Sequence, residues 1–299
     1  MKIVVGHDGS NHADTAIEDL RWAGLPEKAD TIVLSAVEWP TSQALRSWGM
    51  VETDFSPEWI ERIGSAQRVA GDGSDRIQKL FPQWKIEQEP SAGNPADAIL
   101  EKARTWPADL IVVGTHGRSA LGRVLLGSVS LRLIREAACS VRVARSRKRE
   151  GPIRLLIGTD GSPEADAAIR EVCRRSWPAG TETRIVAVHE ALVPLNAERI
   201  AIGERIYDTV NVDDHLRLNH AANEAAEKLR QAGLDATATT EEGEPKHLLV
   251  QLARDWNADA IFVGARGLGR VEGVLLGSVS AAAVAHAPCT VEVVRQSGC

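Results

Sequence analysis

The chain has 299 residues, of which 43% are hydrophobic and 25% charged, and it carries a formal net charge of -6. This length is enough for two domains, and the composition is that of a globular rather than a disordered protein. The acidic balance argues against non-specific nucleic-acid binding, and no apolar run approaches the ~18 residues that a membrane span requires.

The first residues, MKIVVGHDGS, enter a strand-like pattern without a basic segment and an apolar stretch, so we expect no signal peptide. The four cysteines form no C-x-x-C pair, which disfavours a metal site or a thioredoxin-like site. Both features favour a cytoplasmic protein in a reducing compartment.

Short apolar runs alternate with helical patterns along the first half of the chain. Apolar, β-branched runs predict strands at 2–6, 31–38, 84–89, 109–114 and 140–144. Apolar residues at helical spacing predict helices at 11–24, 58–80, 95–105 and 128–138. This alternation predicts a doubly wound, mostly parallel α/β sheet, in which ligands bind outside the carboxyl ends of the strands.

The second half of the chain repeats the first. IVVGHDGS (3–10) returns as LLIGTDGS (155–162), and VLLGSVS recurs unchanged at 124–130 and 274–280. Because the period is the size of a whole domain, the repeat indicates a duplicated domain and not a solenoid.

The boundary between the repeats falls in Ser146–Pro152, a charged segment that contains Gly and Pro. We therefore expect domains at 1–146 and 152–299, joined by a solvated linker. The basic residues of this linker offer little reason to expect nucleic-acid binding.

A glycine constellation follows the predicted fourth strand of each half. The first half reads Gly114-Thr115-His116-Gly117, then nine residues, then Gly127-Ser128, and the second has the same spacing from Gly264-Ala265-Arg266-Gly267 to Gly277-Ser278. Glycines let the backbone approach a ligand closely, and the helix that begins at each Gly-Ser pair offers free N–H groups to an anion. The spacing predicts a phosphate site in each half, with Ser128 and Ser130 as hydroxyl donors. The alternative is that the glycines only form a tight strand-to-helix loop.

Other phosphate-binding signatures are missing from the sequence. There is no G-x-x-x-x-G-K-[ST], which excludes a P-loop NTPase, and no G-x-G-x-x-G after the first strand, which disfavours a dinucleotide fold. The glycine loops contain no lysine and only one histidine, His116, so fast phosphoryl transfer is not expected. The remaining histidines are scattered and predict no metal site.

At this point the residues resemble the universal stress protein family in its tandem, two-domain form. The resemblance covers essentially the whole chain and rests on Asp8-Gly9-Ser10 and Asp160-Gly161-Ser162, the G-x2-G-x9-G-[ST] loop and the final strand of each half. It implies two five-stranded Rossmann-like α/β domains, similar to adenine-nucleotide α-hydrolases and related by a pseudo-two-fold axis. It also implies ATP as the ligand, alone or with Mg²⁺, and a role in stress or growth arrest.

By the same resemblance, ATP contacts come from the ends of the first two strands and from the glycine loop. In the first half they are Gly6, Asp8, Val37, Gly114, Thr115, His116, Gly117, Arg118, Gly127, Ser128, Val129 and Ser130. In the second half they are Gly158, Asp160, Val188, Gly264, Ala265, Arg266, Gly267, Gly277, Ser278, Val279 and Ser280. From the residues alone, Asp8 or Ser10 could equally cap the helix that follows.

The two predicted sites differ in charge. Arg118, Gly122 and Arg123 of the first half become Leu268, Glu272 and Gly273 in the second, whereas Arg266 replaces His116 and could compensate. Because a carboxylate near a polyphosphate is unfavourable, we expect the first site to bind ATP more tightly.

The sequence thus predicts a nucleotide-linked sensor or regulator with no catalytic residues. Three alternatives stay open: a protein-interaction scaffold of the same fold, a slow ATPase, and an ATP pyrophosphatase or nucleotidyltransferase, although the signatures of the last class are missing.

The segments 40–57 and 190–213 differ most between the halves and could form a lid or a partner surface. Members of the family pair their domains two-fold, within a tandem chain or as a homodimer.

Overall fold

The computed structural model describes residues 1–38, 57–117, 126–190, 200–267 and 276–296, with the side chains of 200–210 excepted. The chain divides into two compact units, Met1–Ser146 and Arg147–Gln296. Arg118 and most of the expected lid segments lie outside the described residues.

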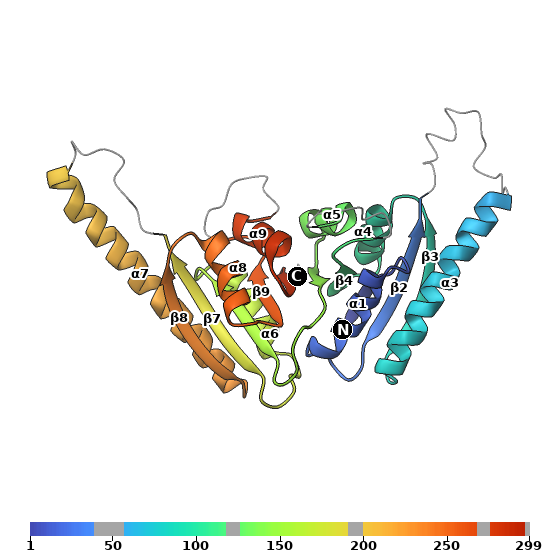
Figure 1. Cartoon of the computed structure of the whole chain (residues 1–299), viewed down its shortest axis with the longest axis horizontal. Coiled ribbons are helices and arrows are strands. Elements are labelled where there is room, and N and C mark those ends of the chain that lie inside the picture. Colours follow the sequence, from blue (N-terminus) through green and yellow to red (C-terminus); the bar gives the residue numbers. More distant parts are fainter. Residues whose placement is uncertain (39–56, 118–125, 191–199, 268–275, 297–299) are drawn as a thin grey trace. The chain divides into compact units, whose positions relative to one another are not determined.

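The first unit is a parallel sheet covered by helices on both faces (Figure 1). Its strands lie in the order β3-β2-β1-β4-β5, and every described pair is parallel. In chain order the elements are β1 (Lys2–Gly6), α1 (Asn11–Asp19), the 3-10 helix η1 (Leu20–Trp22), β2 (Asp30–Val37), α3 (Pro57–Leu80), β3 (Lys85–Ala92), α4 (Pro95–Thr105), β4 (Leu110–Gly114), α5 (Ser128–Glu136) and β5 (Ser140–Ala144).

The second unit repeats this topology, with strand order β8-β7-β6-β9-β10. Its elements are β6 (Arg154–Thr159), α6 (Pro163–Cys173), β7 (Glu182–His189), α7 (Ile200–Gln231), β8 (Asp235–Glu242), α8 (Pro245–Asp255), β9 (Ala260–Gly264), α9 (Ser278–His286) and β10 (Thr290–Val294). The α/β class and the tandem arrangement expected from the sequence are confirmed.

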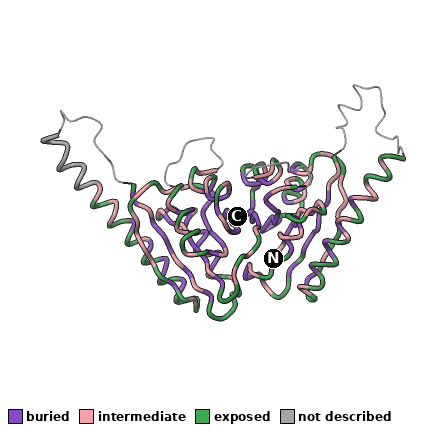
Figure 2. Tube along the Cα trace, in the orientation of Figure 1, coloured by how far each residue is buried: buried purple, intermediate pink, exposed green. Residues whose placement is uncertain are grey.

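The central strands are buried from end to end. All five residues of β4 and all five of β9 are buried, which Figure 2 shows as continuous purple strands. Helices α1 and α3 pack together on one face of the first sheet, and α4 and α5 on the other. Burying a Val, Leu or Ile side chain contributes about 1.5–3 kcal/mol, so these strands hold each layered unit together.

Two elements differ from the sequence prediction at their ends. The α-helix expected over 11–24 ends at Asp19 and tightens into η1, a common way for a helix to close. The strand expected over 84–89 runs instead to Ala92 and includes Pro90. Since β3 pairs only with β2 among the described strands, Pro90 lies on an edge strand, where its missing N–H is tolerated.

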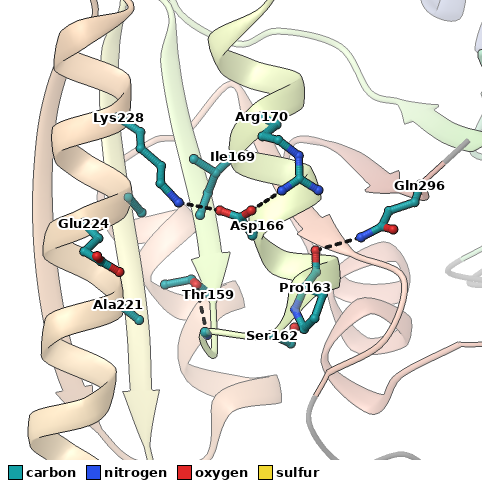
Figure 3. A pocket seen from close by; sticks show the side chains of 12 residues that line it. Thr159, Ser162, Pro163, Asp166, Ile169, Arg170, Ala221, Glu224, Lys228 and Gln296 are labelled. Carbon is teal, nitrogen blue, oxygen red and sulfur yellow. Dashed lines mark hydrogen bonds and ion pairs between the residues drawn. The ribbon is translucent and has the colours of Figure 1, made fainter.

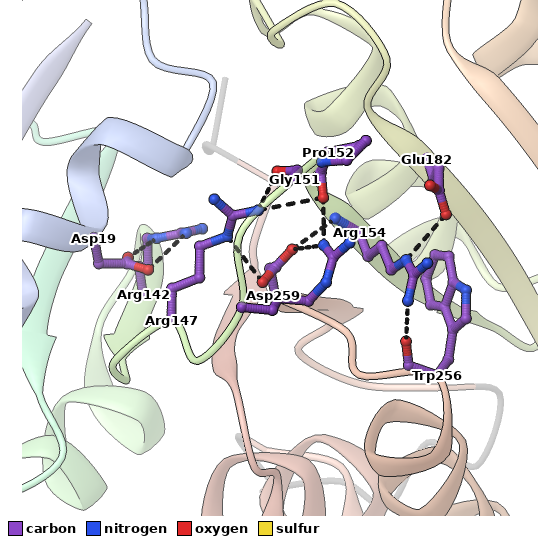
Figure 4. A network of polar contacts seen from close by, with 10 residues as sticks. Asp19, Arg142, Arg147, Gly151, Pro152, Arg154, Glu182, Trp256 and Asp259 are labelled. Atoms are coloured by element: carbon purple, nitrogen blue, oxygen red, sulfur yellow. Dashed lines mark hydrogen bonds and ion pairs between the residues drawn. The ribbon is translucent and has the colours of Figure 1, made fainter.

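The segment between the two repeats is exposed at residues 146, 148 and 150–152, as expected of a solvated linker, but two of its arginines form ion pairs. Arg147 and Arg149 each lie 3.0 Å from an oxygen of Asp259, and Arg147 also donates to the carbonyl of Gly151 (Figure 4). Asp259 in turn accepts from the N–H of Arg154 at 2.9 Å. The basic residues of the linker therefore neutralise a buried carboxylate of the second unit.

A second buried ion pair lies inside the first unit. Arg142 of β5 is 1% exposed and donates to Asp19 of α1 at 2.6 Å (Figure 4). Charges at such depth are found paired, because burying one alone is very unfavourable.

Among the described helices, none combines the length and the apolar character needed to cross a membrane.

Candidate functional site

The candidate site lies where the carboxyl ends of β1 and β4 meet. These two strands are parallel neighbours, and the chain order reverses between them, since β2 and β3 extend to one side and β5 to the other. Such a switch point is where open α/β sheets leave room for a ligand. The equivalent point of the second unit lies between β6 and β9.

Asp8 follows the end of β1, and its carboxylate faces the glycine loop that follows β4. One of its oxygens, Oδ1, accepts from the N–H of Ser10 at 3.0 Å. Its other oxygen, Oδ2, would be only 2.7 Å from a Cβ added to Gly117. Ser10 is the residue that caps α1, because its hydroxyl accepts from the N–H of Ala13. Of the two roles left open for Asp8, the structure therefore assigns the helix cap to Ser10.

The second unit repeats this arrangement. Asp160 accepts from the N–H of Ser162 at 2.9 Å, and its Oδ2 faces Gly267 so closely that the carboxylate would have to shift to admit a Cβ there. Ser162 caps α6. The second glycine of each loop therefore keeps side chains away from an aspartate carboxylate.

The first glycine of each loop has a packing role. A Cβ on Gly114 would lie 2.5 Å from the carbonyl oxygen of His12, and one on Gly264 would lie 2.6 Å from the carbonyl carbon of Glu164. A Cβ on Gly6 would lie 2.8 Å from the side chain of Ile99, and one on Gly158 would lie 3.2 Å from that of Leu249. At Gly114 and Gly264 the absence of a side chain therefore allows close helix–sheet packing, whether or not the loop also binds a ligand.

The third glycine of each loop is the N-cap residue of the helix that follows. Gly127 donates its N–H to the carbonyl of Thr115 at 2.7 Å, and Gly277 donates to Ala265 at 2.8 Å. Because these N-cap residues are glycines, neither α5 nor α9 has the N-cap side-chain bond that Ser10, Asn94 and Ser162 give to α1, α4 and α6. The first helical hydrogen bond of α5 is from Leu131 to Gly127, which leaves the N–H groups of residues 128–130 outside the helical pattern.

The two inner serines are structural. Ser130 is buried and donates its hydroxyl proton to the carbonyl of Gly114 at 2.7 Å, and Ser280 does the same to Gly264 at 2.6 Å. The expectation that the Ser130 hydroxyl is a phosphate donor is therefore wrong, since its single proton is already used. Ser128, by contrast, is exposed at the start of α5.

Two histidines meet at Thr115 of the first loop: His116 belongs to the loop, and His12 comes from α1. The Thr115 hydroxyl lies 3.2 Å from Nδ1 of His12 and 3.1 Å from Nδ1 of His116, and the two rings are 5.2 Å apart. In the second unit the corresponding pair is Glu164 and Arg266, whose charged atoms are 3.6 Å apart. His12 was not among the site residues predicted from the sequence. The repeat could have indicated it, because the equivalent residue 152 positions later is the charged Glu164.

The end of the second strand needs a correction in the second unit. Val37 accepts from the N–H of Gly93, and the residue that accepts from the equivalent Gly243 is His189, not Val188. Because side chains alternate along a strand, the one-residue error exchanges the two faces. His189 is buried, whereas Val188 is only partly so.

His189 belongs to a polar network that the sequence analysis did not find. Its Nδ1 lies 3.0 Å from Asp214 of α7, which also accepts from Arg217 at 2.7 Å. Arg217 then donates to the carbonyl of Asp160 at 2.8 Å, which ties α7 to the end of β6. The hydrogen bond from Arg217 lowers the pKa of Asp214, partial burial opposes this, and His189 adds to the lowering.

No cluster of three or more potential metal ligands occurs in the described ranges. Nor do the tryptophans that repeat before the fourth strand contribute to the site. Trp106 lies beneath the Lys2 ammonium, and Trp256 packs against Arg154 and Arg184, near the opposite ends of the strands.

Comparison with known proteins identifies the family. The model of the "Universal stress protein family" matches residues 1–145 and 153–295. The chain belongs to the universal stress protein family.

Relatives in this family occur in tandem and single-domain lengths. A universal stress protein of Mycobacterium tuberculosis (strain ATCC 25618 / H37Rv) is 29% identical over 304 residues, which cover 99% of this chain and 97% of the relative. One from Thermus aquaticus is 32% identical over 148 residues, 48% of this chain but 97% of that relative. The crystal structure of a universal stress protein from Archaeoglobus fulgidus DSM 4304 shares the fold across 99% of this chain and 96% of its own, with a TM-score of 0.60 and 19% identity.

Proposed function

We propose that each unit binds one ATP molecule at its glycine loop, and that the protein acts as a nucleotide-linked sensor or regulator. The observation that carries this proposal is that both loops combine an aspartate oxygen facing a bare glycine with a helix N-terminus whose N-cap residue is a glycine. Backbone N–H groups at a helix N-terminus hold phosphates well because they are unpaired and lie at the positive end of the helix dipole.

The geometry suggests a role for each group. The N–H groups of 128–130 and 278–280 would hold phosphate oxygens, and Gly117 and Gly267 would let the ligand approach the backbone. The Oδ2 atoms of Asp8 and Asp160, which face the second glycine of each loop, would accept from the ribose hydroxyls. Val37 and His189 would lie at the adenine end. Where Mg²⁺ accompanies ATP, the proposal places it on the phosphates and not on a set of protein ligands.

Fast turnover of ATP is not part of the proposal. Phosphoryl transfer requires charge neutralisation, a held metal and an oriented nucleophile. The histidines nearest the first loop, His12 and His116, are engaged with the Thr115 hydroxyl, and the second loop has Glu164 and Arg266 in their place. The alternatives are a slow ATPase and a nucleotide-free scaffold. We also propose that the protein is cytoplasmic. Its domains would pair within the chain or through a homodimer.

We further propose that the first unit binds ATP more tightly than the second. The cation that could compensate in the second loop, Arg266, lies against the carboxylate of Glu164. The carboxylate that the sequence adds to the second loop, Glu272, lies outside the described residues. If a ligand charge were about 4 Å from it, the repulsion would cost about 1 kcal/mol in bulk water, which is about fivefold in affinity.

Two loop variants and a matched control test the asymmetry. Gly117→Asp and Gly267→Asp each place a second carboxylate against Asp8 or Asp160, whereas Gly71→Asp adds the same side chain on α3, where a Cβ meets only Gln88 at 3.5 Å. We expect Gly117→Asp to remove the tighter of two binding phases for fluorescent ATP, Gly267→Asp to remove the weaker one, and Gly71→Asp to retain both. The asymmetry is wrong if Gly117→Asp leaves the tighter phase intact while Gly267→Asp abolishes it.

A further inference from the structure

A cavity of about 370 Å³ opens in the second unit between α6 and α7 (Figure 3). Thr159, the last residue of β6, lies at its base, Asp166 and Ile169 of α6 form one side, and Ala221 and Lys228 of α7 form the other. This volume falls within the range of small-molecule sites. The cavity lies beside the β6–α6 loop, where a Cβ on Gly161 would meet Ala221 at 3.3 Å, whereas Asp160 faces Gly267. It is therefore distinct from the proposed nucleotide site.

The same place in the first unit is filled by an imidazole. Gly6 pairs with Leu34 and Gly158 with Val186, each 152 positions later (158 − 6 and 186 − 34), so Thr159 is the equivalent of His7. His7 is 4% exposed, and its Nε2 lies 3.1 Å from Oδ1 of Asp14.

The wall of α3 accommodates this ring. A Cβ on Gly73 would come within 3.2 Å of Cγ of His7. Buried residues of α3 and α7 also match 152 positions apart, for example Ala70 with Ala222 (222 − 70) and Ile77 with Leu229 (229 − 77). Gly73 is therefore equivalent to Ala225, and Val69 to Ala221.

The second unit lacks the imidazole ring of His7 but keeps the carboxylate that pairs with it in the first unit. Thr159 takes the place of His7, but Asp166 remains where the first unit has Asp14. Ala221 in place of Val69 removes further bulk, and Ala225 in place of Gly73 returns one methyl group. The space for a ring is thus open, and it is shifted toward Ala221.

The cavity offers an acceptor, Asp166, and a donor, the Thr159 hydroxyl, which are the two partners that a neutral imidazole needs. Asp166 accepts from Lys228 at 2.7 Å and from Arg170, yet a carboxylate has about four acceptor positions and can take a further N–H. The Thr159 hydroxyl accepts from the N–H of Gly161 at 3.2 Å, and its own proton can be donated to a ring nitrogen. We propose that this cavity binds a small ligand bearing an imidazole-type ring, with its N–H on Asp166 and its second nitrogen on Thr159.

The test is a titration of the ¹⁵N-labelled full chain with imidazole, followed by the backbone amide signals. We expect saturable shifts at Thr159, Gly161 and Ala225, with millimolar affinity because the probe is small. Thr159→His should abolish them, since the built-in ring then fills the space. N-methylimidazole, which lacks the N–H, should bind several-fold more weakly, and acetate should leave these signals unchanged.

A second variant keeps the test valid if Thr159→His alone does not fold. Thr159→His combined with Ala225→Gly rebuilds the His7–Gly73 pair of the first unit, so it should fold and still block the shifts. The proposal is overturned if imidazole produces no saturable shifts, if the shifts persist in either variant, if N-methylimidazole binds equally well, or if acetate reproduces them.

Discussion

The first glycine of the loop offers a sharp test of packing at the site, through Gly114→Ala. The added Cβ would lie 2.5 Å from the carbonyl oxygen of His12, while ordinary contact begins at 3.4 Å, so α1 or β4 must move by about 0.9 Å (3.4 − 2.5). The obstacle is backbone, which cannot rotate aside as a side chain can. Ala13, Ala16 and Ile17 of α1 are at most 3% exposed, so the helix has little room to move.

The magnitude follows from two opposing effects. Overpacking a well-packed core costs about 1–3 kcal/mol. Replacing a glycine also restricts the unfolded chain, which stabilises the native state by about 0.4–1 kcal/mol where the backbone tolerates alanine. The clash is the larger effect, so we expect Gly114→Ala to lower the free energy of unfolding of the first unit by about 1–2 kcal/mol.

Native-state hydrogen exchange of the β4 amides measures this unit separately from the other. Gly71→Ala is the control, because a Cβ there meets Gln88 at 3.5 Å and alanine favours the helix by about 0.5–1 kcal/mol. Protection of the Leu110–Gly114 amides should fall in the first variant and be retained or rise in the second. Equal protection in Gly114→Ala and wild type would refute the packing role of this glycine.

Three further predictions concern the inner serines and the network of the second unit. Ser130→Ala should lower the stability of the first unit by about 1–3 kcal/mol in urea unfolding, because it removes a buried donor from the Gly114 carbonyl. Ser280→Ala should do the same to the second unit, and an unchanged midpoint in either would contradict the structural role. The lowered pKa of Asp214 means that its contribution to stability is full above the ordinary aspartate value of about 3.9 and is lost as pH falls through the lower folded value. Asp214→Asn should flatten this acid limb of a pH–stability profile, and a profile identical to wild type would show that the Arg217 contact has no such effect.

Much of the fold follows from the sequence because hydrophobic periodicity is local information. Runs such as LIVVG at 110–114 are long enough to read as buried strands, and the structure places β4 there. The pattern is weaker where a proline interrupts it. Pro90 obscured the last three residues of β3, since only the sheet order shows that this strand lies at an edge.

The candidate site was partly predictable. The repeat identified Asp8 and the glycine loop as a group that recurs at fixed spacing, and the structure brings the Asp8 carboxylate onto Gly117. What spacing cannot show is which glycine is needed for packing, because the His12 carbonyl that crowds Gly114 comes from a helix about a hundred residues earlier. The Ser130 hydroxyl was likewise assigned to a ligand because its partner, a carbonyl of the same loop, carries no sequence signal.

Long-range ion pairs lie beyond sequence reasoning for a similar reason. Arg142 and Asp19 are 123 positions apart, and nothing in either segment marks the other as its partner. The pairing of Arg147 and Arg149 was not predicted either, because charge patterning alone does not reveal that Asp259 is buried beside the linker. Partners of this kind are visible only once the sheet order has brought their segments together.

The central claim, two ATP sites per chain, is tested most directly by isothermal titration of nucleotide-stripped protein with Mg-ATP. The account predicts a stoichiometry of two, in two phases, with the tighter phase belonging to the first unit. A flat titration through the low millimolar range would contradict it, and would favour the nucleotide-free scaffold instead.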